Sequence, residues 1–290
     1  MRISNSLLQQ RVLENLQRNL SGFAQAQNQV STGKRFEKLS EDPLAGSQVM
    51  TAERGLRGIE QYRRNSTAAR TRTDAEEAAL TQITDLLTRA KELALQEGSA
   101  SGTADSRAAT KAEVDRIIEQ VVQLGNTQVG SEYIFAGDLV TTTPFDAAGT
   151  YFGDDGVRKA EVGQGYLVST SHNGRELLVN SGVLSSLQAL STQLGTGTSS
   201  TVGLTATGID TAFTNVQTLL STNGARVRQI ESAMQNSDAL ETNLTLRKSD
   251  LQEINLEEAT TRFVGIQNTL QAALLSTSRV LNTSLTDYLR

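Results

Sequence analysis

The chain has 290 residues, with 27 basic and 32 acidic side chains for a net charge of −5, one histidine and no cysteine. Without thiols it can form no disulfide, no cysteine-ligated metal site and no cysteine nucleophile, and one histidine cannot build a multi-histidine metal site. The mild negative charge argues against generic nucleic-acid binding, which depends mainly on clustered lysine and arginine.

Aromatic residues make up only 4% of the chain. Because aromatic side chains supply much of the buried area of compact cores, the core must come mainly from aliphatic residues along helix seams. We therefore expect a mostly α fold: an elongated antiparallel helical bundle with a terminal coiled coil and a small central β subdomain.

The first expected helix covers about residues 5–31 and carries apolar residues at heptad spacing. Its stripe consists of Leu13, Leu16, Leu20, Phe23 and Val30, with Gln27 in the one missed position. Such an interrupted stripe is too weak to hold an isolated helix together, so the pattern predicts a partner helix.

The last expected helix repeats this pattern. Its stripe consists of Phe263, Ile266, Leu270, Ala273, Thr277, Val280 and Ser284, and it is widened by Leu274, Leu281 and Leu285. We expect the two terminal helices to pair, and their ends, about 1–40 and 255–290, to be disordered in the free monomer. The candidate assembly interface is the apolar set of both stripes: Leu13, Leu16, Leu20, Phe23, Val30, Phe263, Ile266, Leu270, Leu274, Leu281 and Leu285.

Further helices are expected between the two ends. Asp42 and Pro43 predict a helix start, with Asp42 as the cap and Pro43 in the first position, and helical spacing continues to about Glu97. A second helix is expected from a cap at Asp105 or Ser106 to a left-handed end at 125–126. Helical patterns return at 183–194 and 209–249, separated by a loop at 195–208 and followed by a break near 249–250.

Residues 131–180 have a different character. Short β-prone runs at 133–135, 151–152, 165–168 and 177–179 alternate with turn sequences such as Asp154-Asp155-Gly156 and Asn173-Gly174. The sequence therefore predicts three parts: a terminal coiled-coil domain of 1–40 with 255–290, a helical rod of 41–130 with 181–254, and a β-rich insertion at 131–180.

Several segments look chemical but lack the residues that the chemistry needs. The segment 31–35 is similar to a phosphate-binding loop, yet Asn28 occupies the position of the first glycine and Arg35 that of the magnesium-binding hydroxyl. His172, beside a turn sequence, is interpreted as a solvated turn residue, and the pair Glu76-Glu77 as part of a solvated helix face. We expect no enzyme activity, no cofactor and no metal.

A basic run is the strongest signal for another class of protein. It contains Arg54, Arg57, Arg63, Arg64, Arg70 and Arg72. Glu53 and Glu60 lie among these arginines and only Tyr62 could stack on a base, so a salt-bridged face between subunits is the favoured interpretation. The alternative is a coiled-coil scaffold that binds nucleic acid through Arg54–Arg72.

The amino terminus has no apolar core and no small-residue cleavage site, and no apolar stretch reaches the length of a membrane span. We expect neither a cleaved signal peptide nor a membrane partner. Export by a route that uses no cleaved signal remains open.

Motifs along the chain resemble the bacterial flagellin superfamily. They are Met1-Arg2-Ile3-Ser4, 30–35, 40–46, 63–65 and 130–137 in the first half, and Asn223-Gly224-Ala225-Arg226, 256–259 and 284–289 in the second. The motif residues Gly33, Lys34, Arg35, Asp42 and Pro43, with the Tyr-Ile-Phe-Ala-Gly stretch at 133–137, are more similar to the branch that joins hook to filament than to filament flagellin. Asn255 stands where an aspartate is common, which puts that helix cap in question.

The resemblance implies a structural axial protein of the bacterial flagellum that joins hook to filament as a ring of subunits. It implies as partners copies of the same chain, another hook-associated junction protein on the hook side, flagellin on the filament side and an export chaperone before secretion. It also implies an extracellular location in the flagellum, reached without a cleaved signal peptide. The alternative within the superfamily is a short filament flagellin or a flagellin-like paralogue.

Overall fold

The computed structural model describes the backbone of residues 2–99 and 103–288, and the side chains of residues 7, 10–99 and 103–278. The chain divides into two compact units, Met1–Gly58 with Glu241–Arg290 and Ile59–Leu240. Helices dominate both units and the β structure is small, which confirms the mostly α fold class. No helix in the described part of the chain is both long and apolar enough to cross a bilayer.

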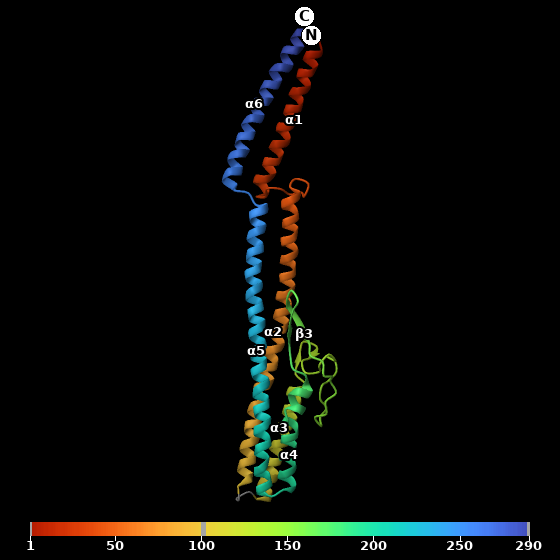
Figure 1. The fold of residues 1–290 in the computed structure, drawn as a ribbon, viewed down its shortest axis with the longest axis vertical. Coiled ribbons are helices and arrows are strands. Elements are labelled where there is room, and N and C mark those ends of the chain that lie inside the picture. Colours follow the sequence, from red (N-terminus) through yellow and green to blue (C-terminus); the bar gives the residue numbers. More distant parts are fainter. Residues whose placement is uncertain (1, 100–102, 289–290) are drawn as a thin grey trace. The chain divides into compact units, whose positions relative to one another are not determined.

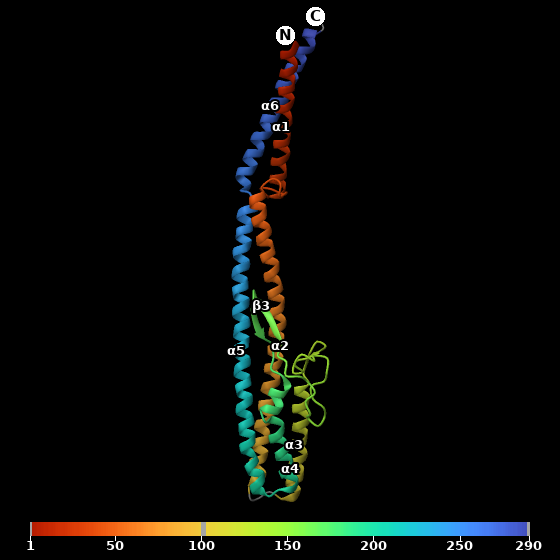
Figure 2. The ribbon, with the colours of Figure 1, turned by 45° about the vertical axis from the view of Figure 1, so that its right-hand side comes forward.

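The first unit contains the two terminal helices, α1 (Arg2–Thr32) and α6 (Leu256–Tyr288). They run antiparallel and side by side, as Figure 1 and Figure 2 both show. The unit also holds the start of α2 (Pro43–Gly98) and the end of α5 (Ser199–Gln252). The two expected terminal helices are therefore present and paired.

The start of α2 follows the expected capping pattern. An Asp42 carboxylate oxygen accepts a hydrogen bond from the backbone N–H of Ala45 at 3.0 Å, and Pro43 is the first helical residue. The helix continues unbroken through Gly55, where a Cβ would lie 2.8 Å from the Leu244 Cδ1 atom. This glycine therefore lets α2 and α5 approach closely, which offsets its low helix propensity.

The second unit is a helical bundle. The remaining parts of α2 and α5 lie alongside α3 (Ala104–Gly125) and α4 (Val183–Thr196), as Figures 1 and 2 show. Apolar residues of all four helices share one core, including Leu80, Ile83, Leu87, Val114, Ile117, Val121, Leu187, Leu190, Val202, Ile209 and Val216.

The predicted position of the end of α3, at 125–126, is confirmed, but its predicted start and the left-handed conformation of its end are wrong. The helix begins at Ala104, where the Thr103 hydroxyl accepts a hydrogen bond from the N–H of Ser106 at 3.1 Å. Its last residue is Gly125, and the cap residue Asn126 has φ −101°, which is not left-handed. The Asn126 amide instead donates to the Phe145 carbonyl and accepts from the Phe145 N–H, both at 2.9 Å. This asparagine fastens the following segment to the helix end.

The loop expected at 195–208 is short, because α5 already begins at Ser199. Val202 and Ala206 are buried in the bundle core, so packing extends the helix through a small-residue segment of low propensity. The break expected near 249–250 lies three to four residues later, between the end of α5 and the start of α6.

The β structure consists of two small hairpins. The strand β1 (Gln128–Val129) pairs with β2 (Glu132–Tyr133), and β3 (Lys159–Gly163) pairs with β4 (Tyr166–Ser169), both antiparallel. The run at 177–179 is not a strand but part of the single-turn π-helix η1 (Arg175–Asn180). Leu177 and Leu178 are adjacent and both fully buried, which a half-buried strand does not allow.

Candidate assembly interface and helix joint

The α1–α6 pair is held by a narrow apolar seam. The rings of Phe23 and Phe263 stack with centroids 5.3 Å apart. Leu270 is the most buried described residue of α6, with 9% of its surface exposed. Leu16 and Ile266 are partly buried along the same pair. These residues were predicted in the heptad stripes, and the structure brings them together.

Other residues of the predicted stripes lie outside this seam. Leu13, Leu20 and Leu274 are 50%, 45% and 47% exposed. On α1 the inward positions next to Leu16 and Phe23 are filled instead by Val12, Asn19 and Ala26, which are partly or fully buried. The reason is geometric: one partner helix covers about two positions per heptad, and on α1 these are 12, 16, 19, 23, 26 and 30, so Leu13 and Leu20 lie beside the covered strip. The side chains of Leu281 and Leu285 lie outside those that the structure describes.

The pair therefore exposes large apolar side chains along both helices. They are Leu7, Leu13 and Leu20 on α1, and Leu256, Val264, Leu274 and Leu275 on α6. We call them the exposed leucine face, although Val264 is one of its members. Series of apolar side chains on paired helices suit the docking of further helices.

The motif residues Gly33, Lys34 and Arg35 form the joint that ends α1. Gly33 has φ +69°, a left-handed conformation that favours glycine and terminates the helix. The backbone N–H of Arg35 donates to the Gln252 carbonyl at 2.6 Å, and that of Ile254 donates to the Gly33 carbonyl at 3.0 Å. The link between α1 and α2 is thereby paired with the link between α5 and α6.

The motif residues Arg35 and Asp42 fix the other side of this joint. The Arg35 guanidinium donates to Asp42 at 3.0 Å, and the Gln29 side-chain amide donates to the Arg35 carbonyl at 2.8 Å. Asp42 thus caps α2 and binds Arg35 at once. Phe36 is buried against Ala45, Val49 and Leu251. The aromatic ring therefore anchors the link in an apolar cluster of its own.

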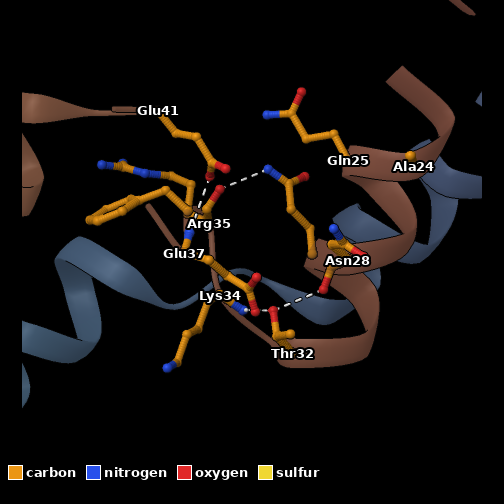
Figure 3. Close-up of a pocket in the computed structure, with 10 residues that line it drawn as sticks. Ala24, Gln25, Asn28, Thr32, Lys34, Arg35, Glu37 and Glu41 are labelled. Atoms are coloured by element: carbon orange, nitrogen blue, oxygen red, sulfur yellow. Dashed lines mark hydrogen bonds between the residues drawn. The ribbon is translucent and has the colours of Figure 1, made fainter. Parts of the chain in front are cut away.

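An open pocket lies beside the joint (Figure 3). Its volume is about 300 Å³, and its lining residues are Ala24, Gln25, Asn28, Gln29, Thr32, Lys34, Arg35, Phe36, Glu37 and Glu41. Gln25 and Asn28 on α1 face the linking segment across the pocket. Amides and charges of both signs give it hydrogen-bond donors and acceptors suited to a polar side chain.

Two further polar contacts stabilise this unit. The Asn255 side-chain oxygen accepts a hydrogen bond from the N–H of Glu257 at 3.0 Å, so the cap of α6 is kept with asparagine in place of aspartate. Lys248 on α5 lies 2.9 Å from the Glu53 carboxylate on α2. The hydrogen bond and charge of Lys248 lower the pKa of Glu53 below its usual value.

The basic run on α2 is paired with carboxylates of the same chain. Arg63 binds Asp238 at 2.9 Å, and Arg64 binds Glu60 at 2.8 Å. Arg70 also pairs with Asp74 and Glu231, and Arg72 with Glu132. The expected salt-bridged face is present, and these four arginines are paired within the chain, while a role of this face in contact between subunits stays a prediction. This pairing removes much of the support for a nucleic-acid groove.

The predictions for His172 and Glu76 are wrong. His172 is 3% exposed and Glu76 is fully buried, and the two side chains contact each other. Both lie in the second unit, on the segment after β4 and on α2. A hydrophilic residue beside a turn sequence is usually exposed to solvent. Nothing in the neighbouring sequence distinguishes the buried His172 from such an exposed turn residue.

Comparison with known proteins gives two family matches. Residues 3–139 match the bacterial flagellin N-terminal helical region, and residues 206–289 match the bacterial flagellin C-terminal helical region. Together they cover most of the chain, and each includes one terminal helix.

Individual relatives agree with these matches. The flagellar hook-associated protein 3 of Escherichia coli is 24% identical over 94% of this chain and 95% of its own length. That of Salmonella typhimurium is 28% identical over 61% of this chain, and the match spans 56% of the Salmonella protein. The solved flagellar junction protein of Legionella pneumophila is 16% identical, with a TM-score of 0.60 over 71% of this chain and all of that one, which shows a common fold.

Proposed function

The chain belongs to the bacterial flagellin family, and we propose on that premise that it is a structural axial subunit that joins hook to filament. The observation that carries the proposal is the similarity to a hook-associated protein 3 along nearly the full length of both chains. The paired terminal helices with their exposed leucine face support it, because an axial subunit must bind neighbours through surfaces that are free before assembly.

The role in this proposal is mechanical. Copies of the chain form a ring through the candidate assembly interface, with another hook-associated junction protein on the hook side and flagellin on the filament side. The joint with Gly33, Arg35 and Asp42 sets the geometry of the link between the terminal helices and the rest of the first unit. The protein needs no catalytic group or cofactor for this task.

The same proposal places the protein outside the cell, in the flagellum. The chain travels there through the flagellar export channel without loss of a signal peptide, after binding an export chaperone in the cytoplasm. The three-part domain division expected from the sequence stays a prediction, as do the individual interface residues.

Deletion of the gene tests this function. We expect electron microscopy to show hooks without filaments and immunoblots to show flagellin released into the medium, with both defects reversed by a plasmid copy of the gene. Filaments of normal length on the deletion strain would refute the junction role.

A second experiment separates a junction protein from a short flagellin. A filament protein binds copies of itself without limit, whereas an adaptor meets different neighbours above and below. Purified protein seeded with broken filaments should therefore add little length, while flagellin from the same cell elongates the seeds. Long filaments grown from this protein alone would favour the flagellin alternative.

A further inference from the structure

A buried polar cluster joins three distant parts of the second unit. Glu76 comes from α2, His172 from the segment after β4, and Arg226 from α5. Their exposed fractions are 0%, 3% and 15%. The backbone N–H of His172 donates to Glu76 Oε1 at 3.1 Å, and the His172 Nδ1 atom contacts the same oxygen. Both the backbone and the side chain of His172 are therefore bound to one buried carboxylate.

The protonation of the imidazole follows from these contacts. Nδ1 lies near both Glu76 Oε1 and, at 3.1 Å, Arg226 Nη1, and it cannot donate to one and accept from the other at once. A buried carboxylate requires donors, so we assign the proton to Nδ1, with the hydrogen bond directed to Glu76. Arg226 then balances the carboxylate charge, with Nη1 3.7 Å from Oε2.

His172 lies at the end of a hairpin segment, residues 157–172, that we call the strap. In Figures 1 and 2 its strands run alongside α2. The strap is fixed to the helices by Val162 and Val168, which pack with Ala69, Ile230 and Ala233 in a small cluster separate from the bundle core. The Asn65 amide of α2 adds one hydrogen bond to the Glu161 carbonyl at 2.8 Å. The apolar anchor of the strap is thus small.

The polar cluster is specific but incompletely satisfied. Among the described residues, Glu76 Oε2 accepts no hydrogen bond, although Arg226 lies near it. A buried carboxylate with one oxygen that accepts no hydrogen bond stabilises the fold less than a carboxylate whose oxygens are all bonded. Such a carboxylate still selects which side chain can pack beside it. A segment with few buried contacts is also the kind that opens without global unfolding.

We propose that Glu76, His172 and Arg226 form a latch that holds the strap against α2 and α5, and that opening the latch releases the strap while these helices stay folded. The proposal does not depend on the proposed function. It gives the strap two positions, closed and released, and it assigns Arg226, in the family-like segment 223–226, a task in closing it.

Hydrogen exchange on the full-length monomer tests the latch. His172→Leu keeps the bulk of the side chain but removes both ring nitrogens, so we expect strap amides to exchange at least tenfold faster and the amides of α2 and α5 at unchanged rates. Thr170→Val is the matched control, because Thr170 is buried in the strap and its hydroxyl donates to the Arg158 carbonyl, also in the strap, at 3.4 Å. The control should exchange as the parent does.

Two further measurements keep the test decisive if the exchange pattern of the leucine variant is complex. Trypsin should cleave His172→Leu first after Arg158 or Lys159, at the start of β3, and leave the parent intact there. The chain has a single histidine, so nitrogen NMR of the imidazole reports the latch alone. It should show protonated Nδ1 in the parent and a changed signal in Glu76→Gln.

Three results would overturn the proposal. Strap amides that exchange equally slowly in His172→Leu and the parent would show that the cluster does not hold the strap. Equal acceleration of helix and strap amides would make it an ordinary part of the core. An Nε2-protonated imidazole in the parent would remove the hydrogen bond to Glu76 on which the latch depends.

Discussion

Leu270→Asp is the most direct perturbation of the α1–α6 seam. Leu270 is 9% exposed, so the substitution removes nearly all of one buried aliphatic side chain. Burial of a leucine contributes about 1.5–3 kcal/mol, and truncation of buried leucines costs about 2–5 kcal/mol. The seam is only two helices thick and the aspartate can turn toward solvent, so we take the lower end, about 2 kcal/mol.

That loss is large for this pair of helices. A change of about 2 kcal/mol weakens the pairing of α1 with α6 roughly thirtyfold, since about 1.4 kcal/mol corresponds to a factor of ten. The seam contains the polar residues Asn19 and Thr277 at partly buried positions, so the pairing of the two helices is only weakly stable before the substitution. We therefore expect Leu270→Asp subunits to be exported but not retained in the flagellum.

The assay compares the amount of protein in the culture medium with that in purified flagella, together with motility in soft agar. Gln271→Asp is the matched control: it adds the same charge at an exposed neighbouring position and should assemble normally. Normal incorporation of Leu270→Asp would refute the reasoning, and so would an equal defect in the control. Accumulation inside the cell would also contradict it, because the defect would then precede assembly.

Three other predictions concern the first unit. Leu275→Asp, at a 65% exposed site, should change monomer stability by less than about 0.5 kcal/mol in urea unfolding yet reduce incorporation into flagella; normal incorporation would remove the exposed leucine face from the interface. In the free monomer, amides of α1 and α6 should exchange far faster than those around Leu80 in the bundle core, and comparable protection would contradict the thin-seam argument. Because Lys248 lowers the pKa of Glu53 from its ordinary value of 4.5, Glu53→Gln should destabilise the chain at pH 7. This effect should fade as the pH falls below 4.5, and a pH-independent effect would exclude the ion pair as its cause.

Much of the helical architecture could be predicted because its signals are local. Heptad spacing identifies both terminal helices, and Asp42 followed by Pro43 identifies the start of α2. The motif residues Gly33 and Arg35 were recognised by resemblance alone, and the structure supplies their physical reason: a left-handed helix end and a bond to the capping aspartate. Caps and periodicity act within a few residues, so they are visible in the sequence.

The latch could not be predicted, because its three members are far apart in the sequence. Glu76 precedes another glutamate on a helix, and His172 precedes an Asn-Gly pair, which are ordinary features of solvated surfaces. Only the packing of α2, α5 and the strap makes them mutual partners. The prediction of a strand at 177–179 was wrong for a related reason. Three consecutive apolar residues fit a strand and a buried helical turn equally well.

Leu13 and Leu20 show how an incorrect prediction within one chain can still inform the assembly. The pattern places them in the seam, yet α6 covers only Leu16, Phe23 and their inward neighbours. The apolar surface of α1 is thus wider than α6 covers, and a further helix packed on Leu13 and Leu20 would bury the rest, at about 1.5–3 kcal/mol for each leucine. Each added neighbour would then stabilise the seam as well as the contact, because a helix must be folded to present its leucines. On the proposed function, folding of the terminal helices and joining of subunits are thereby coupled, and a weak seam in the monomer is strengthened by each subunit that joins.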